Sequence, residues 1–181
     1  MNVKSRFNVL RNPVALISAV FIILSMCFYW WRIWFVETTG GIGIKVYPHS
    51  LVGRIPEPEM VPNIGHSLQW FFVVLVILIV IIVIGSFLEK KIGIPLILLA
   101  SSLCLAIHYV FRMRLQARID KAVVSSMITL PNLPIEGEIF MEGYTIATKF
   151  GPGYDIILVA GIIGILSVIL HDRIRINLKR S

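Results

Sequence analysis

Charged side chains are scarce in this chain of 181 residues, where Asp, Glu, Lys and Arg together make up 15%. They are missing from the interiors of four long apolar stretches, apart from Arg32 near the end of the first stretch. Acids and bases inside a membrane mark proton relays and ion pathways. Their absence counts against a self-contained pump or secondary transporter, while a pore formed by oligomers remains an alternative.

Cysteine is also scarce, with Cys27 and Cys104 alone and no CxxC pair, so thiol–disulfide chemistry is not indicated. The chain has no HExxH motif, no P-loop and no GxGxxG in the strand–turn–helix context that such a motif needs. We therefore predict no catalytic residues and no metal site. The two cysteines are interpreted as small packing residues, although their similar depth would also permit a disulfide or a pair of ligands.

Apolar residues dominate what is present, with a hydrophobic share of 57% and a mean hydropathy of +0.85. Residues 71–84 contain no polar side chain, so a soluble fold would have to cover that helix on every face. About 20 apolar residues in a helix cross the hydrocarbon core of a bilayer. We therefore expect an all-α membrane protein, a four-transmembrane-helix bundle with spans at residues 14–36, 68–88, 92–111 and 154–170.

Lys and Arg are distributed unevenly around these spans. The arm 1–13, the turn 89–91 and the tail 171–181 hold nine cations and two acids, a net charge of +7 that equals the charge of the whole chain. By the positive-inside rule, this predicts a multi-pass protein of the cell membrane with both termini cytoplasmic. The basic character then needs no nucleic acid, and no aromatic stacking pattern accompanies the cations.

The two long loops, 37–67 and 112–153, contain β-prone segments. In the first loop, residues 42–47 follow a glycine turn and predict a hairpin. The second loop should begin as a helical continuation of the third span and then form strands at 127–130, 138–141 and 144–150. Together we expect a small extracytoplasmic cap of three to five strands. This layout resembles, in outline, that of claudin-like tetraspan proteins, whose first-loop signature of Trp and paired Cys this chain lacks.

Aromatic residues gather at the outer ends of the spans, where a belt at the membrane surface is the simplest interpretation. An inner belt is almost missing, so the outer layer could instead line a groove for a partner helix, a lipid headgroup or a quinone-like ligand. Asp155 is the expected counter-ion of Arg32 or Arg112, because an unpaired charge at this depth is costly. The predicted interaction residues of this layer are Trp30, Trp31, Trp34, Trp70, Arg112 and Asp155.

Two further patterns supply candidate residues. The small residues Ala160, Gly161, Gly164 and Ser167 lie on one side of the fourth span and would let another helix approach closely, either within the bundle or in another subunit. His108 and His66 lie towards the outer ends of the third and second spans. With Arg32 they are weak candidates for holding a haem or a quinone.

These observations lead us to expect a non-catalytic integral membrane subunit or scaffold of a larger membrane protein complex. Its partners would be the lipid bilayer and other membrane subunits, with no nucleic acid and no bound cofactor. The main alternative is a redox module that interacts with a quinone or haem, and a further alternative is an oligomeric channel. Function should concentrate on the extracytoplasmic side, because the cytoplasmic segments are too short to build a pocket.

Overall fold

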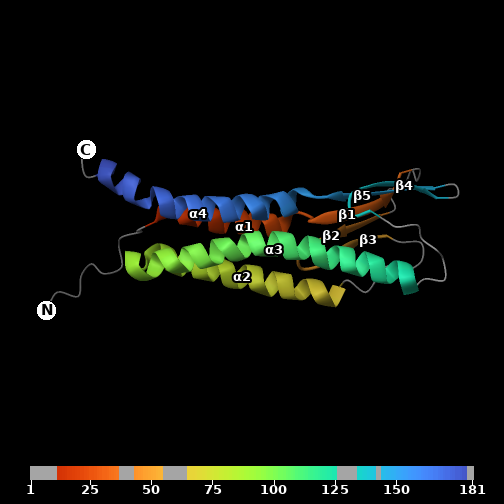
Figure 1. Cartoon of the computed structure of the whole chain (residues 1–181), viewed down its shortest axis with the longest axis horizontal. Helices are drawn as coiled ribbons and strands as arrows, with labels where there is room; N and C mark the ends of the chain where they lie inside the picture. The colour runs from red at the N-terminus through yellow and green to blue at the C-terminus, as the bar shows by residue number, and fades with distance from the viewer. Residues whose placement is uncertain (1–11, 37–42, 55–64, 126–133, 142–143, 179–181) are drawn as a thin grey trace.

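The computed structural model describes residues 12–36, 43–54, 65–125, 134–141 and 144–178. Within these ranges the chain forms four helices and five strands. The helices are α1 (Pro13–Cys27), α2 (Gly65–Phe87), α3 (Lys90–Ser125) and α4 (Pro152–Leu178). They lie side by side along the long axis of the molecule, with the sheet at one end and the outer part of α3 running beside it (Figure 1).

Three of these helices, α2, α3 and α4, are long and apolar enough to cross a membrane. Between 28% and 39% of the residues in their apolar windows are buried in the molecule, so most of each window faces outward. The outward side chains include large apolar ones such as Ile77, Leu99 and Ile162, which are about half exposed. An exterior of this kind is typical of a helix bundle that is surrounded by lipid.

The first apolar stretch differs from the prediction of a helical span over 14–36. The helix α1 ends at Cys27, and the backbone at Phe28 is already extended, with φ −105° and ψ 152°. Fifteen residues of helix cover only about 22 Å, which is less than the roughly 30 Å of a hydrocarbon core. The apolar run continues, but Trp31–Phe35 forms the strand β1. Aromatic and β-branched residues suit a strand, so hydropathy alone hides this change of structure.

The strand β1 lies in the middle of an antiparallel sheet with the order β3-β2-β1-β5-β4. Its neighbours are β2 (Gly43–Val46), β3 (Leu51–Arg54), β4 (Gly137–Met141) and β5 (Tyr144–Phe150). The predicted hairpin of the first loop and the strands near 138–141 and 144–150 are therefore confirmed, as is the helical continuation beyond residue 111. The predicted strand at 127–130 lies outside the described residues.

The core runs without interruption from the bundle into the sheet. Leu78 and Ile97 represent its part between the helices, and Trp30 and Phe111 represent the junction. Leu115 and Ile119, on the outer part of α3, are buried in the same cluster as Ile44 and Val46 of β2. The sheet thus packs against the extension of α3, and this contact explains why that helix continues well past the length of a membrane span.

Small residues bring α1, α3 and α4 close together inside the bundle. Ala160, Gly161, Gly164 and Ser167 of α4 are all buried. The Ser18 hydroxyl on α1 donates a hydrogen bond to the carbonyl of Ala160 at 2.7 Å. A Cβ atom at Gly164 would collide with the hydroxyl of Ser101 on α3. This small face is therefore used for packing within the chain, the simpler of the two predicted alternatives, and is not free for a second subunit.

Gly164→Ala should lower the free energy of unfolding by about 1–3 kcal/mol, because the added methyl group has no room beside Ser101. Titration with a denaturing detergent, followed by circular dichroism, measures this difference. The control variant Val159→Ile adds one carbon atom to the exposed face of the same helix and should change stability by less than about 0.5 kcal/mol. Equal stability of the two variants would contradict this packing of α3 and α4.

Candidate functional site

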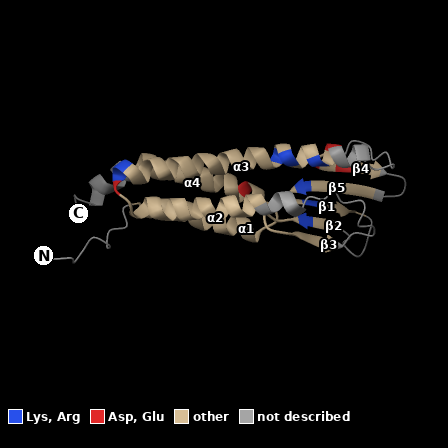
Figure 2. Cartoon of the chain, turned by 90° about the horizontal axis from the view of Figure 1, so that it is seen from below, with Lys and Arg blue, Asp and Glu red and all other residues tan. Residues whose placement is uncertain are grey.

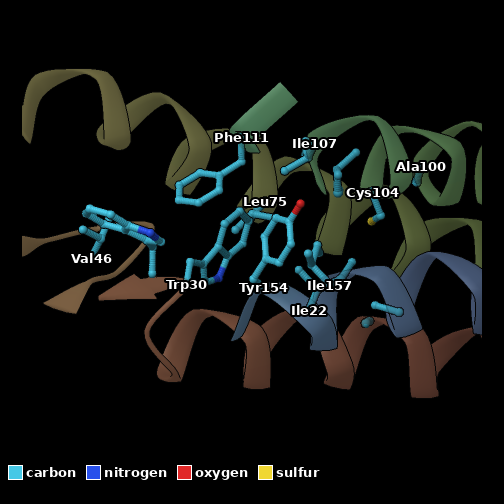
Figure 3. Packing of buried hydrophobic residues seen from close by; sticks show 14 of the residues in the cluster. Ile22, Trp30, Val46, Leu75, Ala100, Cys104, Ile107, Phe111, Tyr154 and Ile157 are labelled. Atoms are coloured by element: carbon cyan, nitrogen blue, oxygen red, sulfur yellow. The ribbon is translucent and has the colours of Figure 1, made fainter. Parts of the chain in front are cut away.

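An aromatic cluster fills the junction between the helix bundle and the sheet (Figure 3). Trp30 is completely buried, and its ring meets Phe111 of α3 edge-on at a centroid distance of 5.0 Å. Phe71 of α2 lies 5.7 Å from Phe111 in a similar arrangement. Tyr154 of α4 completes the cluster, 5.9 Å from Phe111. The cluster therefore joins Trp30 to one ring from each of α2, α3 and α4, with Phe71 and Phe111 in direct contact with the indole.

Backbone hydrogen bonds hold Trp30 at this junction. Its indole N–H donates to the carbonyl of Ser25 in the last turn of α1 at 2.9 Å, which satisfies a carbonyl that the helix end leaves free. Its backbone N–H donates to Val46 of β2 at 2.7 Å, and its carbonyl accepts from Gly151 at 3.0 Å. The residue thus joins α1, the sheet and the start of α4, and it occupies a structural position rather than a membrane-surface belt.

Glycine at position 153 permits α4 to begin directly against this turn. A Cβ atom there would lie 2.6 Å from both the carbonyl oxygen of Phe28 and Cδ1 of Trp30. Separations this short do not occur between real atoms, so any larger residue would push α4 away from α1. The backbone N–H of Gly153 donates to the carbonyl of Tyr29 at 3.1 Å. Close backbone approach is the reason for glycine here.

A stack of three rings lies next to the cluster on its outer side. Tyr154 is sandwiched between His108, at 3.8 Å and 23°, and Phe150, at 4.2 Å and 19°. The guanidinium of Arg112 lies 6.0 Å from the ring of Phe150. Arg112 lies one helical turn beyond His108 on α3, and Asp155 directly follows Tyr154, against which His108 stacks. The outer layer predicted from the sequence therefore does bring His108, Arg112 and Asp155 into one region.

The predicted pairing of Asp155 with Arg32 or Arg112 is absent from the described part of the chain. Asp155 lies exposed in the first turn of α4, where the helix N-terminus stabilises a negative charge without a cationic partner. Arg32 lies instead on the central strand β1, with its guanidinium 4.0 Å from the ring of Trp34. The predicted pairing is wrong because it assumed that residues 14–36 form one helix, whereas Arg32 lies on a strand beyond the end of α1.

The other predicted residues are divided between the core and the surface. Trp31 is buried, and its indole N–H donates to the carbonyl of Ile135 at 2.8 Å. Trp34 is half-buried on the sheet, and Trp70 is 73% exposed on α2, as a belt residue would be. His66 belongs to α2, but its side chain lies outside the described residues. Among the described residues, no three His, Cys, Asp or Glu side chains gather as a metal site would require.

Two sets of contacts that hold the elements together were not predicted, one at Asn12, at the opposite end of the bundle from the aromatic cluster, and one at Gly151 and Gly153. Asn12 caps α1 by accepting from Ala15 at 3.2 Å, and its side-chain amide donates to the carbonyl of Ser167 on α4 at 3.3 Å. Gly151 and Gly153 bring the start of α4 against Tyr29 and Trp30. An Asn-Pro pair at the start of an apolar run is a helix-start signal that could have identified the cap. The role of the two glycines depends on which segments meet, so it had no local signal.

Comparison with known protein families gives no match for this chain, and comparison with curated proteins gives none either.

Trp30→Ala should lower the free energy of unfolding by about 3–5 kcal/mol, because it empties the centre of the junction and removes the indole hydrogen bond. The same detergent titration measures the loss, and Trp30→Phe should recover part of it by keeping a ring in place. Trp70→Ala is the matched control, since that side chain is largely exposed and does not belong to the buried cluster. If Trp70→Ala proved as damaging, Trp30 would not be the centre of the junction.

Proposed function

We propose that this protein is a multi-pass integral membrane protein that serves as a non-catalytic subunit or scaffold of a larger membrane complex. Its termini and the turn near residue 89 would lie in the cytoplasm, and the sheet would lie outside. The observation that carries the proposal is the distribution of side chains over the surface. The exterior of the bundle is apolar, and charged groups collect at its two ends (Figure 2).

The length of the apolar band supports the membrane assignment. It begins after Lys91 near the start of α3 and ends at Arg112 within the same helix, a distance of 21 residues or about 31 Å of helix. This length matches the hydrocarbon thickness of a bilayer. Trp30 packs against Phe111, the residue before Arg112, so the junction around Trp30 would lie near the outer surface of the membrane, with buried backbone groups paired inside the protein.

The sheet supports a role in interaction. Its two edge strands are β3 and β4, and each carries a large apolar side chain that faces outward: Val52 is 54% exposed and Phe140 is 75% exposed. Exposed apolar side chains on a sheet edge are typical of surfaces that pair with another chain. A scaffold that offers such an edge above the membrane would bind the extracytoplasmic part of another subunit.

The orientation is tested with two cysteine variants made in a Cys27→Ala, Cys104→Ala background. Glu138→Cys on β4 and Glu89→Cys at the opposite end both replace exposed acids. In intact cells, a membrane-impermeant maleimide should label position 138 and leave position 89 unlabelled until the cells are opened. Labelling of position 89 in intact cells would contradict the proposed orientation. Labelling of neither position would show that the sheet is not exposed outside the cell.

The scaffold role is tested by purification in a mild detergent. The 20.4 kDa chain should elute with other membrane proteins in fixed proportion, and Phe140→Ser should lower their recovery at least severalfold because it removes an exposed apolar contact. Glu138→Ser on the same strand is the matched control and should retain them. A monodisperse monomer without co-purifying protein would contradict the role.

A second candidate function rests on the ring stack. His108 is partly buried near the outer end of the bundle, with one ring face against Tyr154, and an imidazole N–H there could hydrogen-bond the carbonyl of a quinone. The described residues place no second histidine beside it, which does not fit a haem with two axial histidines. Extraction of the purified protein with organic solvent decides this candidate, and protein without quinone would remove it.

A further inference from the structure

Three cations occupy directly opposed positions across the middle of the sheet. In the strand register, Arg32 of β1 lies opposite Lys45 of β2 on one side and opposite Lys149 of β5 on the other. Residues directly opposite in neighbouring antiparallel strands point to the same face and have Cα atoms about 4.5–5.5 Å apart. Lys45, Arg32 and Lys149 therefore form a continuous row, called the cationic row below, which Figure 2 shows in blue.

Such a row is unfavourable by itself, because like charges directly opposite each other in a sheet repel. Among the described residues, no carboxylate forms an ion pair with any of the three cations. The strand β4 carries Glu138, but its register partner is Ala147, not a cation. The Nε–H of Arg32 is buried and has no hydrogen-bond partner within the same part of the chain. The row thus combines uncompensated positive charge with an unused donor.

Aromatic rings lie beside two of the three cations of the row, Arg32 and Lys45. The guanidinium of Arg32 lies 4.0 Å from the ring of Trp34 and 5.8 Å from the ring of Tyr29. The ammonium of Lys45 lies 5.7 Å from the same Tyr29 ring. Rings at these distances attract a cation and restrict its side chain. The side chains of Arg32 and Lys45 are therefore already restricted beside one ring. Binding an anion would then cost less side-chain conformational entropy.

The row crosses the strands near the end of the sheet that is next to the helices. Arg32 is the second residue of β1, Lys149 lies three residues before α4 begins, and Lys45 is the last residue but one of β2. Exposed aromatic residues near the outer ends of the neighbouring helices, Trp70 and Tyr109, mark the depth at which headgroups would lie. The row is thus at the height of a phosphate layer if the bundle spans a bilayer.

We propose that the cationic row binds the phosphate group of an anionic ligand, and that its position favours the phosphodiester of a membrane lipid. Arg32 would donate through its planar fork, which matches phosphate oxygens, while Lys45 and Lys149 would flank it as point charges. The choice of a lipid rests on the membrane position proposed above. The anion site itself depends only on the row and its rings.

The test uses the full chain purified in a mild detergent and titrated with short-chain phosphatidylglycerol, short-chain phosphatidylcholine or inorganic phosphate. Native mass spectrometry counts the bound molecules and gives their affinities. Lys45→Gln combined with Lys149→Gln changes two exposed residues and should leave the fold intact. It should weaken phosphatidylglycerol binding about fivefold for each lost cation, about 25-fold in total. Arg114→Gln with Arg118→Gln removes two charges from α3 and is the matched control.

Tighter binding of phosphatidylglycerol than of phosphatidylcholine, lost in the Lys45/Lys149 variant and kept in the control, supports the site and its lipid source. Specific binding of inorganic phosphate with the same variant pattern supports the site and assigns it a soluble ligand. Equal loss in both double variants, or equal binding of the two lipids, overturns the proposal.

Arg32→Lys keeps the charge but loses the fork, so unchanged affinity in that variant would exclude the proposed role of Arg32. The topology labelling at positions 138 and 89 is independent of these outcomes, so failure of the membrane assignment would be recognised separately.

Discussion

The architecture depends on the burial of one side chain, Trp30, at the point where helix becomes strand. Its ring packs against Phe71 of α2 and Phe111 of α3, and Tyr154 of α4 packs against Phe111 in turn. Its polar groups bond to the last turn of α1, to β2 and to the segment before α4. A large amphipathic ring suits this place because the apolar body fills the junction while the N–H satisfies a free helix carbonyl. The bundle and the sheet therefore share one core.

This shared core has consequences for both parts of the molecule. The sheet has five short strands and would be marginal alone, but its apolar face rests on the outer part of α3. In turn, α1 is followed directly by β1, the central strand of the sheet, so the chain passes from the bundle into the sheet at this point. A side chain on β1 is thereby fixed relative to the helices. For this reason Arg32 occupies a defined height above the bundle, and the cations opposite it do as well.

Two basic regions of the described chain arise for different reasons. At the end of the bundle near residue 90, cations lie next to the ends of the apolar helices and can interact with lipid and water without a fixed partner. On the sheet, backbone pairing brings three cations together irrespective of their mutual repulsion. The aromatic contacts of Tyr29 and Trp34 reduce that repulsion only in part. The two basic regions therefore differ in kind, because the first follows from composition and the second from strand register.

The sequence by itself determined the helical class, the bounds of α2 to within a few residues, and the strands near 138–141 and 144–150. These features follow from hydropathy, from alternation and from glycine or proline at the ends of elements, and all of these act over short stretches of chain. Only the tertiary structure decided whether residues 28–36 continue the helix or form a strand. An apolar run that contains aromatic and β-branched residues is compatible with either a helix or a strand, and the pairing partners of β1 lie between 9 and 119 residues away. The same long-range pairing formed the cationic row and placed Gly153 against Trp30, contacts for which the local sequence has no signal.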